Sequence, residues 1–176
     1  NENIEGLDTR FKIIEDYWID IGSPKKLWEA DRVLRENELE PEISEEVEIS
    51  DQASVGEKAR IEDNVKVEEG AVIKGDSVIC EDTVIGPNTV VEGSTVGLNS
   101  QLENCHIQES LLFEENIIDS FVDLENAVFG EECDVKSGSV VKESFIGPRS
   151  YLDMNNSIRG VKFVPDARTD LSEISK

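Results

Sequence analysis

The chain has 176 residues, with 17 Lys and Arg against 40 Asp and Glu, giving a formal net charge of −23 at pH 7. This charge argues against nucleic acids and anionic membranes as partners, because both would be repelled. The apolar runs are only a few residues long, which is too short for a transmembrane helix, so no membrane span is expected.

The residues before position 47 predict a short strand, one helix and a connection. Residues 1–22 end in apolar runs that favour extended structure. Ser23 as N-cap and Pro24 at the first helical position predict a helix over residues 23–37. Residues 38–46 are acidic and are expected to connect this helix to the next domain.

The predicted helix has one apolar and one polar face. Asp31 and Arg32 are expected on the solvated face. Two tryptophans are expected to pack the junction between strand and helix, and these are Trp18 and Trp28. The residues expected to line the apolar face are Leu27, Trp28, Ala30 and Leu34.

A six-residue repeat dominates residues 47–158. From Ile49 to Val91 every sixth residue is Ile or Val, and the residue four places later, from Ala53 to Thr95, is small or β-branched. An amphipathic helix would repeat at about 3.6 residues and a simple strand at about 2. The observed period instead fits short strands separated by turns, with three strands closing each coil. Residues 18 apart then stack on neighbouring coils, as expected for Ile61 and Ile79.

Beyond Val96 the spacing alternates between five and six residues and ends at Leu152, which predicts about six coils. The register is least regular between residues 107 and 129, where Leu124 or Val122 can take the inward position. Residues 159–176 are expected to form an irregular tail over the last coil. Glycine follows the inward residue at several positions, where we expect it to permit a tight turn, namely Gly56, Gly86, Gly97, Gly130 and Gly147.

This pattern resembles the hexapeptide-repeat family, and the resemblance implies an all-β fold, a left-handed parallel β-helix. Many members of that family are acyltransferases that bind acyl-CoA in a trimer and use one histidine as a general base. His106 is the only histidine, so only His106 could serve here. The alternative is a structural, solvent-facing His106. Charge favours that alternative, because Gly75 to Val135 holds fourteen acids and no Lys or Arg, which would repel the CoA diphosphate.

The run from Tyr17 to Pro24, YWIDIGSP, resembles the end of the catalytic domain in sugar-1-phosphate nucleotidyltransferases. Long glucose-1-phosphate thymidylyltransferases and mannose-1-phosphate guanylyltransferases of that family continue into a left-handed β-helix. The resemblance implies a parent enzyme that joins a nucleoside triphosphate to a sugar-1-phosphate, with Asp20 helping to hold Mg²⁺. The alternative role for Asp20 is a turn-capping carboxylate before Gly22.

The family's Gly-rich nucleotide loop and its other metal-holding Asp do not occur in this sequence, so the segment alone is expected to be inactive. The β-helix would then be an assembly, stability or regulatory module of a cytoplasmic homo-oligomer. Two other hypotheses stay open. One is the acyltransferase domain of a bifunctional amino-sugar enzyme, and the other is a non-enzymatic oligomerisation scaffold.

Three cysteines and the high acidity indicate the cellular setting. Cys80, Cys105 and Cys133 are odd in number and their spacing fits no zinc pattern, so we expect structural thiols in a reducing cytoplasm. Dense carboxylates in a folded chain are typical of a host with a salty cytoplasm, such as a halophilic archaeon.

Overall fold

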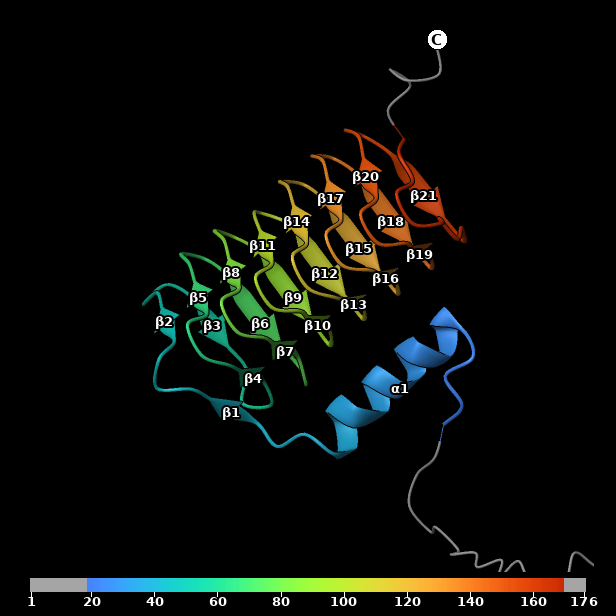
Figure 1. Cartoon of the computed structure of the whole chain (residues 1–176). Coiled ribbons are helices and arrows are strands. Elements are labelled where there is room, and N and C mark those ends of the chain that lie inside the picture. The colour runs from blue at the N-terminus through green and yellow to red at the C-terminus, as the bar shows by residue number, and fades with distance from the viewer. Residues whose placement is uncertain (1–18, 170–176) are drawn as a thin grey trace, which may run out of the picture.

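The computed structural model describes residues 19–169 and shows a left-handed parallel β-helix flanked by one α-helix (Figure 1). Each of its three walls is a sheet of seven short parallel strands. The first sheet comprises β1 (Glu42–Ile43), β4 (Arg60–Ile61), β7 (Val78–Ile79), β10 (Thr95–Val96), β13 (Leu111–Leu112), β16 (Val128–Phe129) and β19 (Phe145–Ile146). The second comprises β2 (Glu48–Ile49), β5 (Lys66–Val67), β8 (Val84–Ile85), β11 (Gln101–Leu102), β14 (Ile117–Ile118), β17 (Asp134–Val135) and β20 (Tyr151–Leu152). The third comprises β3 (Ser54–Val55), β6 (Val72–Lys74), β9 (Val90–Glu92), β12 (His106–Gln108), β15 (Asp123–Glu125), β18 (Val140–Lys142) and β21 (Ser157–Arg159).

The β-helix has seven coils rather than about six, because the repeat extends further at both ends than expected. β1 lies within residues 38–46, the predicted connection, and Ile43 pairs with Ile61. Ile43 stands six residues before Ile49, so the six-residue repeat begins one step earlier in the sequence than predicted. At the other end, Ile158 is buried six residues after Leu152, where the repeat was expected to stop.

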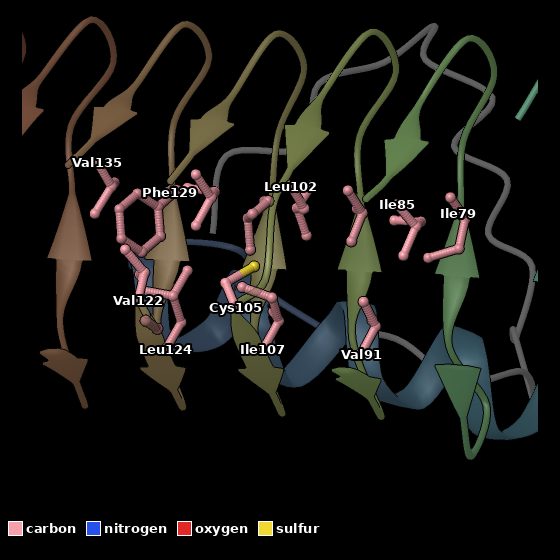
Figure 2. Packing of buried hydrophobic residues seen from close by; sticks show 14 of the residues in the cluster. Ile79, Ile85, Val91, Leu102, Cys105, Ile107, Val122, Leu124, Phe129 and Val135 are labelled. Atoms are coloured by element: carbon pink, nitrogen blue, oxygen red, sulfur yellow. The ribbon is translucent and has the colours of Figure 1, made fainter. Parts of the chain in front are cut away.

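The predicted inward positions of the large apolar residues are confirmed from Ile61 to Leu152. Ile61 pairs with Ile79 on the next coil of the first sheet, and both side chains are almost fully buried. In the irregular stretch Leu124 pairs with Ile107 and occupies the inward strand position, whereas Val122 is buried at the preceding corner. Figure 2 shows Ile79, Ile107, Val122 and Leu124 within one continuous core, to which Ile61 also belongs. Interior burial of one large aliphatic residue per strand is therefore the main stabilising contribution.

Thr95 does not occupy the small inward position that the hexad count assigned to it. From β9 onward the corner between the third and first sheets is one residue shorter, and Ser94 is buried there instead. The Ser94 hydroxyl oxygen accepts a hydrogen bond from the Ser110 backbone N–H at 3.0 Å. Thr95 consequently points outward, toward the helix.

Each corner of the triangle carries a column of residues with positive φ. Glycine and asparagine tolerate this left-handed conformation best, whereas a bulky residue is strained in it. Between the second and third sheets, one bulky member, Phe121, has φ of 64° and a side chain that is 73% exposed. The other residues of that column are Gly70, Asn88, Asn104, Gly138 and Asn155.

The glycines that follow inward residues have a different role from the one expected. Gly97 and Gly130 do not adopt positive φ, so no turn requires a glycine there. A Cβ on Gly97 would instead lie 2.4 Å from the carbonyl carbon of Phe113, and one on Gly130 would lie 2.6 Å from the nitrogen of Pro148. These glycines let the backbones of neighbouring coils approach closely.

The helix α1 spans Pro24–Asn37, and Ser23 is its N-cap, as predicted, accepting a hydrogen bond from the Lys26 N–H at 3.3 Å. It runs beside the first sheet (Figure 1). Val78, Leu111 and Val128 face outward from that sheet yet are buried beneath the helix. Leu34 was expected on the buried face but is 50% exposed.

The ends of the described region differ from the expected strand and tail. The strands expected over residues 11–18, with Trp18, lie outside the described residues, and residues 19–22 form no strand. After β21 the chain follows the coil path and makes isolated parallel bridges, Phe145 with Lys162 and Tyr151 with Arg168. Phe163 packs against the core there, so residues 160–169 cover the last coil. Within residues 19–169, no helix is long and apolar enough to cross a membrane.

Candidate functional site

Asp20, the residue matched to metal binding, is exposed just before α1. Its carboxylate lies next to Gly22, with both oxygens 3.9 Å from where a Cβ on that glycine would be. Within residues 19–169 no three His, Cys, Asp or Glu side chains come together as metal ligands. Mg²⁺ prefers several oxygen ligands in octahedral geometry, so the described residues do not by themselves fit a magnesium site.

A polar cluster fixes α1 to the β-helix. Trp28 Nε1 donates to the Glu109 carbonyl of the β-helix at 2.7 Å, whereas the strand against which Trp28 was expected to pack lies outside the described residues. Asp31 accepts a hydrogen bond from the Thr95 hydroxyl at 2.6 Å and one from Arg35 Nε at 2.9 Å. Asp31 was expected on the solvated face, but its side chain is only 12% exposed, because it faces the first sheet.

Arg35 lies at the centre of this cluster. Its side chain is 1% exposed, and its guanidinium also lies 3.1 Å from the Asp76 carboxylate. Burial raises the pKa of Glu109 nearby, and repulsion from Asp76 adds to this, whereas Arg35 acts in the opposite direction. Removing one partner from such a buried ion pair leaves an uncompensated charge, so the cluster specifies where the helix sits.

His106 belongs to a second cluster, on the outer face of the third sheet. Its Nδ1 lies 3.1 Å from Asp123 Oδ1, one coil along, and Lys142 Nζ lies 3.0 Å from the other oxygen of Asp123. Burial raises the pKa of Asp123, but hydrogen bonds from Lys142 and His106 outweigh it and lower the pKa overall. An imidazole that donates from Nδ1 has Nε2 available to accept a proton. The side chain of His106 is 43% exposed, which matches the solvent-facing alternative.

The three cysteines are free thiols. Cys105 and Cys133 are buried, and Cys80 is half-buried. Burial raises the pKa of Cys80 and of Cys105 to about 12, and that of Cys133 to about 11. Thiolate formation is therefore suppressed near neutral pH.

A groove lies where the first turn of α1 meets β16 and β19. Its volume is about 480 Å³, and its apolar walls are formed by Trp28, Val128, Phe145 and Val161. The charged residues of the lining are Lys25, Lys162 and Glu143. His106 lines neither this groove nor two further cavities, of about 840 and 560 Å³, near the first coils.

Sequence reasoning missed the partners that hold the helix. Thr95 and Glu109 are recognisable only once the shortened corners are counted, since the strict hexad places Thr95 inside. Asp76 lies 41 residues from Arg35 along the chain and gives no local signal.

Several solved structures resemble this chain at low identity. The acetyltransferase domain of PglB from Neisseria gonorrhoeae shares 20% identity over 65% of this chain and 51% of that chain, with a TM-score of 0.34. UDP-N-acetylglucosamine O-acyltransferase from Moraxella catarrhalis shares 13% over 66% and 62%, with a TM-score of 0.44. Perosamine N-acetyltransferase from Caulobacter crescentus shares 18% over 76% and 59%, with a TM-score of 0.38. The chain thus spans about half to three-fifths of these structures.

The family comparison is more specific. No curated protein matches the chain. The model of the GMPPB C-terminal domain matches residues 40–159, which includes every strand of the β-helix. The chain therefore belongs to the GMPPB C-terminal domain family, the β-helix domain found at the C-terminus of sugar nucleotidyltransferases.

Proposed function

We propose that this chain is the C-terminal segment of a cytoplasmic sugar-1-phosphate nucleotidyltransferase, in which the β-helix is an assembly, stability or regulatory module. The observation that carries the proposal is the family match over residues 40–159, which directly follows the YWIDIGSP run and its helix. The run that resembles the end of the catalytic domain thus precedes the β-helix domain, which is the order expected in such an enzyme.

The proposed parent reaction forms a nucleotide sugar. A phosphate oxygen of the sugar-1-phosphate attacks the α-phosphorus of a nucleoside triphosphate, and the bond from that phosphorus to the bridging oxygen breaks. Pyrophosphate leaves with the bond electrons. Mg²⁺ would neutralise charge on the phosphates, and Asp20 would contribute one carboxylate to it together with residues outside 19–169.

The contacts of α1 support a mechanical role for the β-helix. Because Arg35, Asp31 and Trp28 fix the helix against three successive turns of the coil, α1 belongs to the β-helix domain rather than to a loose linker. A catalytic domain ending at residue 22 would then be joined to a rigid support. Ile43 and Ile49 of the first coil remain 47% and 39% exposed, which is apolar surface available for a homo-oligomer.

An Asp20→Asn variant of the full-length protein tests the metal role. We expect pyrophosphate release to fall at least tenfold and to need more Mg²⁺ for half-maximal rate, because one anionic ligand is lost. Asp51→Asn, at an exposed corner of the first coil, is the matched control and should leave both quantities unchanged. Equal kinetics for Asp20→Asn and wild type would remove Asp20 from the site.

The second candidate is the acyltransferase hypothesis, and the His106–Asp123 contact favours it, since an oriented imidazole is what a general base requires. Acetyl transfer from acetyl-CoA to amino sugars or their nucleotide derivatives, lost in His106→Gln, would support this candidate. If neither activity occurs in the full-length protein while its oligomer persists, the scaffold hypothesis is favoured.

A further inference from the structure

The groove at the first turn of α1 has the size and lining of a ligand site. About 480 Å³ falls within the range of small-molecule pockets. α1 buries the apolar outer row of the first sheet at Val78, Leu111 and Val128, but Phe145 continues this row beyond the end of the helix and is only partly buried. The apolar surface is therefore left open in one place, between Trp28 and Phe145.

Charge around the groove is opposite to that of the chain. Within residues 19–169, Lys25 and Lys162 form no ion pair with a carboxylate, and both line the groove. Glu143, the one acid in the lining, is paired with Arg159 at 2.7 Å. Within residues 19–169, a chain with a net charge of −23 thus presents at this groove two lysines that form no ion pair, although Lys25 also stabilises the nearby Glu29 carboxylate electrostatically.

The aromatic rings already interact with cations. The Lys162 ammonium lies 5.8 Å from the ring centre of Phe145, and the Arg32 guanidinium lies 5.1 Å from that of Trp28. Apolar and aromatic walls favour a flat, stacking group, and the lysines favour an attached anion. A nucleotide combines both features in one molecule, because its base stacks and its phosphates are anionic.

We propose that this groove is a non-catalytic binding site for a nucleoside diphosphate or its sugar ester, held by stacking on Phe145 and by the ammonium groups of Lys25 and Lys162. The site is separate from the proposed catalytic reaction, although the choice of a nucleotide over other aromatic anions rests on the proposed function. A ligand bound in the groove would contact α1 through Lys25 and the last coils through Phe145 and Lys162.

Binding is measured by calorimetry on the chain of residues 1–176, with GDP, dTDP, UDP and ADP as probes at low salt. We expect saturable binding with Kd in the millimolar range or tighter for at least one probe. The Lys25→Gln/Lys162→Gln double variant should weaken it by about tenfold or more, and Phe145→Leu by about tenfold, the equivalent of one stacking contact. Lys58→Gln is the matched control, because Lys58 is also exposed and has no ion pair among residues 19–169, but lies outside the groove.

Three outcomes would overturn the proposal. They are no saturable binding of any probe, equal affinity in the groove variants and wild type, and inorganic pyrophosphate binding as tightly as the nucleotides. Thermal melting of each variant establishes that it is folded before binding is compared. Since the chain alone is expected to lack nucleotidyl transfer, this result is independent of the activity assay, and either proposal can fail without the other.

Discussion

Replacing Gly97 by alanine tests how closely the coils are stacked. The new Cβ would lie 2.4 Å from the Phe113 carbonyl carbon, 2.5 Å from its oxygen and 2.7 Å from the Glu114 nitrogen. All three atoms belong to backbone, so no flexible side chain can move away. Relief requires displacement of a coil whose strands are paired on both sides.

We expect a net destabilisation of up to about 2.5 kcal/mol, from a clash that costs about 1–3 kcal/mol. Overpacking of a close-packed interior costs about this much, and the loss of unfolded-state freedom on going from Gly to Ala recovers about 0.4–1 kcal/mol of it. For a chain of this size, each kcal/mol lowers the melting temperature by about 2–4 °C.

Urea unfolding followed by circular dichroism provides the measurement, and Gly56→Ala is the matched control. Gly56 occupies the same phase of the repeat, but its Cβ would meet the nearest atom, the Ile73 carbonyl oxygen, at 3.3 Å. We expect Gly56→Ala to change stability by less than about 1 kcal/mol. If the two variants were equally stable, close backbone approach would not be the reason for glycine at position 97.

Four further predictions concern strain, charge and thiols. Phe121→Asn should raise the melting temperature by a few degrees, because it relieves about 1–2 kcal/mol of left-handed strain at an exposed site, and a lower melting temperature would contradict this. Arg35→Met should lower the free energy of unfolding by about 2–4 kcal/mol, because the Asp31 and Asp76 carboxylates lose their buried partner. Arg32→Met is the control in the same urea titration. Its side chain is 43% exposed, so this change should cost less than about 1 kcal/mol. Thermal stability should rise between about 0.1 and 2 M KCl as screening weakens carboxylate repulsion, and a flat profile would argue against the salt-adapted hypothesis. The buried thiols of Cys105 and Cys133 should react with a disulfide reagent at pH 8 only at the rate of unfolding, since both are inaccessible and burial raises their pKa values, and rapid labelling of either in the native chain would refute this.

The core of the fold was accessible from sequence because its signal is local and periodic. Each inward residue repeats after five or six positions, so the pairing of Ile61 with Ile79 follows from counting. Errors arose where one residue was lost from a corner, since a single deletion moves the next side chain to the opposite face. Thr95 is the example. The hexad count placed its side chain in the core, but it points outward and its hydroxyl donates to Asp31 of α1.

The candidate sites were less accessible because their partners are distant in sequence. His106 could be singled out as the only histidine, but its contact with Asp123 depends on a spacing of 17 residues within the irregular stretch. The apolar-face argument for α1 held for Ala30, which is buried, but failed for Leu34, which is exposed. Its packed surface is centred on Asp31 and Arg35, whose burial depends on partners in the β-helix and not on hydrophobicity.

Pyrophosphate release by the full-length protein tests the central claim most directly. The assay offers a panel of nucleoside triphosphates, each with a panel of sugar-1-phosphates, in the presence of Mg²⁺. The account predicts release that depends on both substrates for at least one pair, and none from residues 1–176 alone. Acetyl transfer from acetyl-CoA without any sugar-dependent pyrophosphate release would contradict it.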